Sequence, residues 1–162
     1  PVWADKATQQ RLLKGFSYIF NTPKKSKYPP ICELNLINST DVTIQGSGGE
    51  IHFRPLLVNH GDINALGFKM GKLAYIPDVL EIPSKSWKEL ENLDFIIIDA
   101  LRRDPHPSHT HLEKTLLWLR KLEPRRAILT NMHIDLDYKK VCEETPNHVT
   151  AAYDGMEIRY EL

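Results

Sequence analysis

The chain is poor in cysteine, with two among its 162 residues, Cys32 and Cys142. Because these thiols are far apart in the sequence, they provide neither the disulfide framework of a small secreted domain nor a four-cysteine zinc site. Long apolar runs are also missing, since the longest aliphatic run, over 95–98, falls far short of the roughly 20 residues of a membrane-spanning helix. We therefore expect a cytoplasmic protein with no membrane partner.

An excess of charge of either sign is absent too, because 21 Lys and Arg residues balance 21 Asp and Glu residues. This balance argues against a broad electrostatic surface for nucleic acid. Lys24, Lys25 and Lys27 beside Tyr28 could touch a phosphate backbone, although a solvated loop is the preferred interpretation. Charged residues at 26% and hydrophobic residues at 41% are typical of a globular protein, and we expect one domain over residues 1–162.

Two common catalytic or nucleotide-binding motifs are missing as well. The chain has no Gly-x-Ser-x-Gly segment, so a serine hydrolase has no anchor in it. The glycine-rich segment 46–49 lacks the Lys-Ser/Thr pair of a phosphate-binding loop and precedes a predicted strand rather than a helix.

The apolar pattern predicts a mixed sheet with helices. Alternating and β-branched residues predict strands over 51–58, 95–98 and 127–130, and hairpins over 65–76 and 151–160, the last around Asp154-Gly155. Capping residues and helical spacing predict helices over 5–15, 84–90, 111–122 and 137–144. The predicted fold class is a mixed-sheet α/β or α+β layer structure.

Seven histidines are what the sequence does have, and some of them follow predicted strands. His60, Asp78 and His133 all lie at strand ends, where loop side chains can converge in one cleft. Imidazole and carboxylate together suit zinc or manganese. Hydrogen-bonded loop residues without a metal are the alternative, and the spacing leaves both open.

A second group of histidines lies between a predicted strand and a predicted helix. His106, His109 and His111 fall within a proline-stiffened loop that follows Arg102. The group could supply a proton donor or a phosphate contact. It could equally be a solvated loop at a helix start, while Asp99 ends the buried strand and accepts backbone N–H bonds.

Six segments occur in an order that resembles a known family. They are His60-Gly61, Leu66-Gly67-Phe68-Lys69-Met70, Leu73-Ala74-Tyr75-Ile76-Pro77-Asp78-Val79, Asp99-Ala100-Leu101-Arg102, Pro105-His106-Pro107-Ser108-His109, and residues 129–138. Together they resemble the metallo-β-lactamase-fold hydrolases. The branch that is most similar comprises the cyclic-phosphate phosphodiesterases of phosphonate metabolism, and the tRNA 3′-end-processing endonucleases are more distant.

The resemblance implies an αββα sandwich that holds two divalent metal ions, zinc or manganese, in a cleft at the sheet edges. It implies that His60 completes the first metal site and that the catalytic Asp78 bridges both ions. It further implies that His109 assists catalysis from outside the metal shell. We expect His106, Arg102 and Asn131 to contact the substrate.

This chain departs from the family pattern in two places. The His-x-His-x-Asp-His motif of the N-terminal half is absent, so the chain resembles a C-terminal portion of the domain. The family's last metal histidine follows Leu-Thr, where this chain has Asn131 and then His133. Because positions two apart on a strand share one side, we expect His133 to serve as the ligand, with the carbonyl oxygen of Asn131 as the alternative.

The function that follows is a metal-dependent phosphodiesterase, which hydrolyses a small cyclic phosphodiester or a nucleotide through a metal-bound hydroxide. The alternative is a non-catalytic or incomplete domain with a binding or structural role, because the main ligand motif is missing. For the chain by itself we expect weak or single-metal occupancy. We also expect an exposed apolar sheet face, and therefore a homodimer or aggregation.

Overall fold

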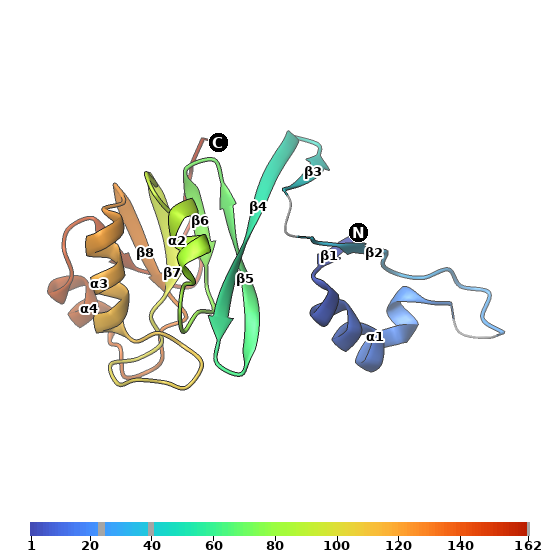
Figure 1. Ribbon diagram of the computed structural model, residues 1–162, viewed down its shortest axis with the longest axis horizontal. Helices are drawn as coiled ribbons and strands as arrows, with labels where there is room; N and C mark the ends of the chain where they lie inside the picture. Colours follow the sequence, from blue (N-terminus) through green and yellow to red (C-terminus); the bar gives the residue numbers. More distant parts are fainter. Residues whose placement is uncertain (23–24, 39–40, 162) are drawn as a thin grey trace. The chain divides into compact units, whose positions relative to one another are not determined.

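The computed structural model describes residues 1–22, 25–38 and 41–161 (Figure 1). The chain divides into two compact units, Pro1–Val42 and Thr43–Leu162. Lys24, from the predicted basic loop, lies outside the described residues.

The first unit contains strand β1 (Val2–Ala4), helix α1 (Lys6–Phe20) and strand β2 (Leu34–Leu36), and β1 pairs with β2 in parallel. Asp5 caps α1 as predicted, because its carboxylate accepts a 2.7 Å hydrogen bond from the backbone N–H of Thr8. The predicted end at Gly15 is wrong: the helix kinks at Phe16 and continues to Phe20. Gly15 is tolerated inside the helix instead of ending it.

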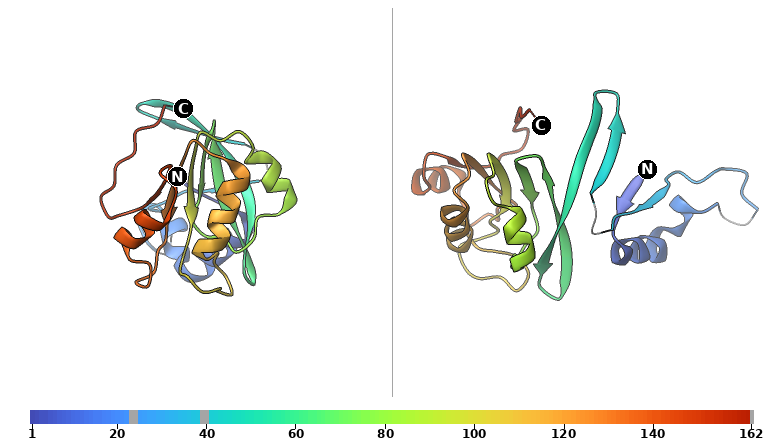
Figure 2. Two further views of the ribbon diagram at one scale, coloured as in Figure 1. Left: turned by 90° about the vertical axis from the view of Figure 1, so that its left-hand side faces the viewer. Right: turned by 45° about the horizontal axis from the view of Figure 1, so that its top comes forward.

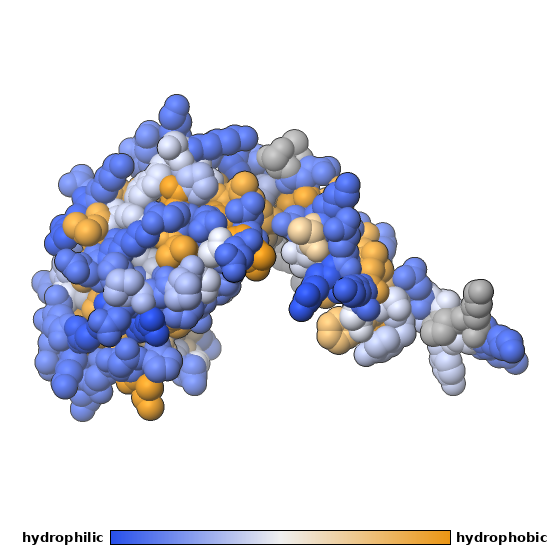
Figure 3. Space-filling model, turned by 60° about the horizontal axis from the view of Figure 1, so that its bottom comes forward, coloured by the Kyte–Doolittle hydropathy of each residue, from blue (hydrophilic) through white to orange (hydrophobic). Residues whose placement is uncertain are grey.

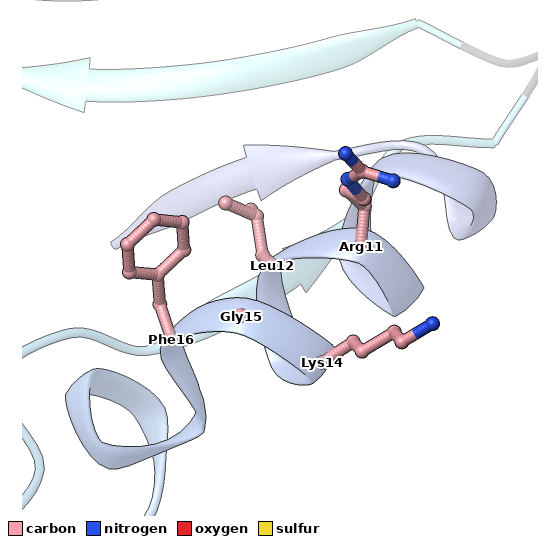
Figure 4. Close-up of a pocket in the computed structure, with 5 residues that line it drawn as sticks. All are labelled: Arg11, Leu12, Lys14, Gly15 and Phe16. Atoms are coloured by element: carbon pink, nitrogen blue, oxygen red, sulfur yellow. The ribbon is translucent and has the colours of Figure 1, made fainter.

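A hollow on α1 has a volume of about 430 Å³ and is lined by Arg11, Leu12, Lys14, Gly15 and Phe16 (Figure 4). All of its lining residues come from one stretch of a single helix. It therefore brings together no groups from different elements and is not a candidate site.

The second unit is built on a seven-stranded sheet with the order β3-β4-β5-β6-β7-β8-β9. Its strands are β3 (Val42–Gly46), β4 (Gly49–His60), β5 (Ile63–Met70), β6 (Leu73–Ile76), β7 (Phe95–Asp99), β8 (Arg126–Thr130) and β9 (Val149–Ala151). The pairs β4–β5 and β5–β6 are antiparallel, and β6–β7, β7–β8 and β8–β9 are parallel. The predicted mixed α/β class is confirmed.

Three helices accompany this sheet: α2 (Ser84–Glu89), α3 (Leu112–Leu122) and α4 (Tyr138–Glu144). Each matches a predicted helix to within about two residues, the usual uncertainty of helix ends. Asp137 caps α4 through a 3.0 Å hydrogen bond from the N–H of Lys140. None of the helices in the described ranges is both long and apolar enough to cross a membrane.

One face of the sheet carries the hydrophobic core. Ile76, Ile98 and Leu129 lie side by side in register and are fully buried. α2 and α3 lie over this face (Figures 1 and 2), and Leu119 of α3 joins the same buried cluster. Burial of side chains of this size contributes about 1.5–3 kcal/mol each, so this face anchors the second unit.

The opposite face is more open. Tyr75 pairs with Ile97 there, and Tyr75 is 41% exposed while Leu57 is 49% exposed. Figure 3 shows apolar residues scattered among hydrophilic ones on the side that it views. Exposed apolar side chains on a sheet agree with the expected open face, but the expected homodimer stays a prediction.

The predicted terminal hairpin is half wrong. The turn at Asp154-Gly155 forms, with the N–H of Met156 donating to the carbonyl of Tyr153 at 3.0 Å. No strand follows it within residues 152–161, and the ring of Tyr160 packs against Phe95 with centroids 6.1 Å apart. The Asp154-Gly155 pair is a local signal, so the turn could be predicted from it. The contact partner of the segment that follows is set by residues far away in the sequence, which a local pattern does not reveal.

Candidate metal centre

The strand directions bring several chain segments to one edge of the sheet. β6, β7 and β8 run parallel, and β4 runs in the same direction because two antiparallel pairings separate it from β6. The carboxyl ends of all four strands therefore lie at one edge, where sites of such sheets form. His60 ends β4, and Asp78 follows β6.

Three side chains with metal-binding atoms converge at this edge. His60, Asp78 and His109 each offer one donor atom, and these atoms lie within 4.8 Å of one another. The rings of His60 and His109 meet edge to face, with centroids 4.5 Å apart. The structure thus brings together His60 and Asp78, which the sequence predicted as ligands, and adds His109 to the same cluster.

The turn after His60 is pressed against the loop that carries His109. Gly61 has a φ of +75°, and a Cβ atom there would lie 2.9 Å from the carbonyl oxygen of Pro107 and 3.0 Å from the Cβ of Ser108. Glycine is therefore required both by the left-handed backbone and by the close approach. No local sequence pattern marks this contact, because it joins segments 46 residues apart.

The loop between β7 and α3 is held by buried hydrogen bonds. The N–H of Thr110 donates to the carbonyl of Val79 at 2.6 Å, and the hydroxyl of Thr115 donates to the carbonyl of Asp99 at 2.7 Å. Arg102 donates to the carbonyl oxygens of Asp104 and Pro105 at 3.1 and 2.6 Å. Arg102, predicted to contact substrate, thus braces this loop.

Asp99 lies behind His109 and orients it. Its carboxylate is fully buried, accepts from the N–H of Val79 at 3.1 Å, and lies 2.7 Å from Nδ1 of His109. Burial raises the pKa of Asp99, and the hydrogen bonds from Val79 and His109 partly offset this. With Nδ1–H of His109 donating to Asp99, Nε2 is left with a lone pair or a transferable proton, as in carboxylate–histidine–metal arrangements.

The cluster fits a divalent metal ion. Nδ1 of His60 is buried and has no hydrogen-bond partner among the described residues, which is costly unless the nitrogen binds something. Two imidazoles and a carboxylate form a donor set that suits zinc or manganese. His60 and Asp78 supply two ligand groups, and His109 lies close enough to act either as a third ligand or as a proton donor beside the ion.

His106 lies next to the cluster, with its ring centroid 5.3 Å from that of His109. Its Nδ1 accepts from the N–H of Ser108 at 3.3 Å. Partial burial lowers the pKa of His106, and the positive charges of Arg102, His109 and His60 lower it further. A neutral imidazole beside the cluster remains compatible with the predicted role in substrate binding.

The strand that would place Asn131 and His133 on the same side ends before both residues. β8 ends at Thr130, and Asn131 has a φ of +64°, so the expectation that both positions share one side of a strand is wrong. Nδ2 of Asn131 lies 3.4 Å from Nδ1 of His109, whereas the exposed ring of His133 pairs with Asp135. Asn131 therefore lies beside the cluster, and His133 as the last metal ligand stays a prediction.

Most of the chain matches a known protein family. Residues 1–134 match the family described as the beta-lactamase superfamily domain. The chain belongs to this family. The predicted resemblance is confirmed, and the matched residues include strands β3 to β8 and the cluster at their edge.

Individual proteins are also similar to this chain. The chain is 26% identical to an octanoyltransferase of Porphyromonas gingivalis (strain ATCC BAA-308 / W83), over 96% of the chain and 31% of the relative. A diphosphatase of the PhnP family superposes with a TM-score of 0.84 at 28% identity, over 96% of the chain and 56% of the diphosphatase.

Two further structures show the same fold. Zinc-bound PqqB from Methylobacterium extorquens has a TM-score of 0.68 at 14% identity, over 98% of the chain and 64% of PqqB. The short form of human tRNase Z has a TM-score of 0.59 at 14% identity, over 99% of the chain and 66% of tRNase Z. The family match and the PhnP-family diphosphatase indicate a hydrolase superfamily. The chain spans about a third of the octanoyltransferase and about half of the diphosphatase.

Proposed function

We propose that this chain is the metal-binding portion of a metal-dependent phosphodiesterase that acts on a small, cyclic phosphodiester or on a nucleotide. The observation that carries the proposal is the convergence of His60, Asp78 and His109, with the buried Asp99 behind His109. Similarity to a diphosphatase and to tRNase Z supports a phosphoester as the substrate.

His60 and Asp78 would hold the metal, zinc or manganese, and Asp78 would face two ions in the complete protein. A bound divalent ion polarises phosphoryl oxygens and lowers the pKa of water, which makes a nucleophile available at neutral pH. Asp78 is exposed, so a metal ion can reach it from solvent.

His109 would move the proton. Its Nδ1–H donates to Asp99, so Nε2 is the atom that can carry a proton to the leaving oxygen. The buried carboxylate of Asp99 would hold the ring in the orientation that presents Nε2 for this transfer. His106 and Asn131 flank His109 and would contact the phosphoester, while Arg102 would position His106 through its bonds to the loop backbone.

The first prediction tests the metal cluster. His60→Ala and Asp78→Ala should each abolish bound metal and hydrolysis of a chromogenic phosphodiester, because each removes one of the three converging donors. Metal content is measured by elemental analysis of the full-length protein after dialysis against manganese or zinc. His52→Ala is the matched control, since this exposed histidine of β4 contacts Thr43 and Glu50 and lies outside the cluster.

The result would count against the proposal if both variants kept full metal content, or if a metal-loaded protein hydrolysed no phosphodiester. A non-catalytic role is the second candidate, and it is favoured by the small number of donors: among the described residues the cluster has three. Metal binding without turnover in the full-length protein would support that candidate.

A further inference from the structure

A second hollow lies beside the metal-binding cluster. It has a volume of about 650 Å³ and is lined by residues that follow β7, β8 and β9, among them Asn131, Tyr153 and Asp154. Asn131 belongs to both regions, because its Nδ2 lies 3.4 Å from Nδ1 of His109. A ligand whose phosphate sits at His60, Asp78 and His109 could therefore extend past Asn131 into this cavity.

The chemistry of the lining does not suit the phosphate itself. Neither Lys nor Arg is among the lining residues, and the ring of the one histidine, His133, already pairs with Asp135. The carboxylate of Asp154 would repel an anion there. The occupant is therefore an uncharged part of the substrate.

The lining suits a planar, hydrogen-bonding group. Tyr153 is 56% exposed, and its ring makes an edge-to-face contact with Tyr138, with centroids 6.0 Å apart. Met132 and Met156 add adaptable apolar surface. The amide of Asn131 and the carboxylate of Asp154 can hydrogen-bond the amino, imino and hydroxyl groups of a nucleoside.

We propose that this cavity binds the nucleoside of a nucleotide phosphoester, with the base stacked on Tyr153 and the sugar or base edge hydrogen-bonded to Asn131 and Asp154. The inference rests on the proposed phosphodiesterase function and narrows its substrate class to nucleotides. Tyr153 determines specificity in this assignment and takes no part in the chemistry at the metal cluster.

The test compares two substrates that release the same product. The p-nitrophenyl ester of thymidine 5′-monophosphate carries a nucleoside, and methyl p-nitrophenyl phosphate does not. In the full-length, manganese-loaded protein, Tyr153→Ala should raise KM for the nucleoside ester on the order of tenfold, as loss of base stacking does, and leave KM for the methyl ester unchanged. Tyr153→Phe should behave like the wild type, and Tyr28→Ala is the control for loss of an exposed tyrosine.

An equal change for both esters, or no change for either, would overturn the assignment. Calorimetric titration with thymidine 5′-monophosphate gives a second readout that does not need turnover. If neither ester is hydrolysed, the proposed phosphodiesterase function fails, and the titration alone decides the cavity: binding that Tyr153→Ala weakens supports it, and absence of binding overturns it.

Discussion

Two neighbouring segments at the same sheet edge are built very differently. The loop from β7 to α3 is tied down by Asp99, Thr110 and Thr115, all of which are buried. The segment after β8 starts with the exposed Asn131 in a left-handed conformation and continues through the exposed His133. Both segments follow parallel strands that pair in register. The first is nevertheless held by buried hydrogen-bonding residues, whereas the second lies at the surface.

This difference corresponds to two separate requirements of the proposed hydrolase: accurate placement of a reacting group and access for the substrate. A group that transfers a proton must be placed accurately, and the hydrogen bond to the buried Asp99 would do this for His109 in the proposed reaction. A segment that meets the variable part of a substrate must be accessible, and Asn131 is exposed and lines the cavity beyond it. In the proposed phosphodiesterase, the fixed loop would supply the proton transfer, and the exposed segment would contact the variable part of the substrate.

Within these two segments, the largest expected effect comes from removing the imidazole of His109. His109→Ala should lower turnover by about 10²–10⁴-fold, the usual contribution of general acid catalysis. His106→Ala should lower turnover by less than His109→Ala does. The reason is that Nδ1 of His106 faces Ser108 and that its ring lies beside the cluster rather than in it. Steady-state kinetics and metal analysis of both variants check this.

Metal content discriminates between the two roles that the geometry allows for His109. Retained metal with lost turnover identifies it as the proton donor. Loss of metal from His109→Ala would make it a ligand, since its nitrogen lies within 4.8 Å of donor atoms of His60 and Asp78. Unchanged activity would contradict both roles.

A smaller effect is expected when the support behind His109 is altered. Asp99→Asn keeps an oxygen for the N–H of Val79 but removes the charge that holds Nδ1–H of His109, so metal affinity or turnover should fall by about 10–100-fold. Thr115→Val is the matched control, because its buried hydroxyl bonds the backbone of Asp99 and does not touch His109. Thermal unfolding and activity are measured on both variants.

Thr115→Val should lower the free energy of unfolding by about 1–3 kcal/mol, the cost of leaving a buried acceptor unpaired, and keep its activity per folded molecule. If both variants lose stability and activity in the same proportion, Asp99 acts only by holding the loop. A larger activity loss in Asp99→Asn than its stability loss explains would assign it to the orientation of His109.

Much of the fold could be predicted from local patterns, and the contacts within the site could not. The apolar run 95–98 and the leucine spacing of 112–122 are local signals, and β7 and α3 form there. His60 and Asp78 could be found because both follow predicted strands. The close packing of Gly61 on Pro107 left no local trace.

His133, the last candidate metal ligand, shows how the conformation of a single residue can limit a prediction from sequence. The strand pattern placed Asn131 and His133 on one side, and a single positive φ at Asn131 ends that alternation. Sequence spacing measures side-chain direction only while the strand continues. The prediction for His133 therefore depended on a strand end that the sequence did not mark.

The smallest expected effect is at His133 itself. The ring of His133 pairs with Asp135 at the surface, and the segment is held by the backbone N–H of His133, which donates to the carbonyl of Leu101 at 2.7 Å. His133→Ala keeps that backbone bond, so metal content should not change and turnover should stay within roughly twofold, as for most surface substitutions. Asn131→Ala, next to His109, should have the larger effect on turnover. Loss of metal from His133→Ala, with Asn131→Ala unaffected, would show that the segment after β8 rearranges to bring His133 to the cluster, as the sequence led us to expect.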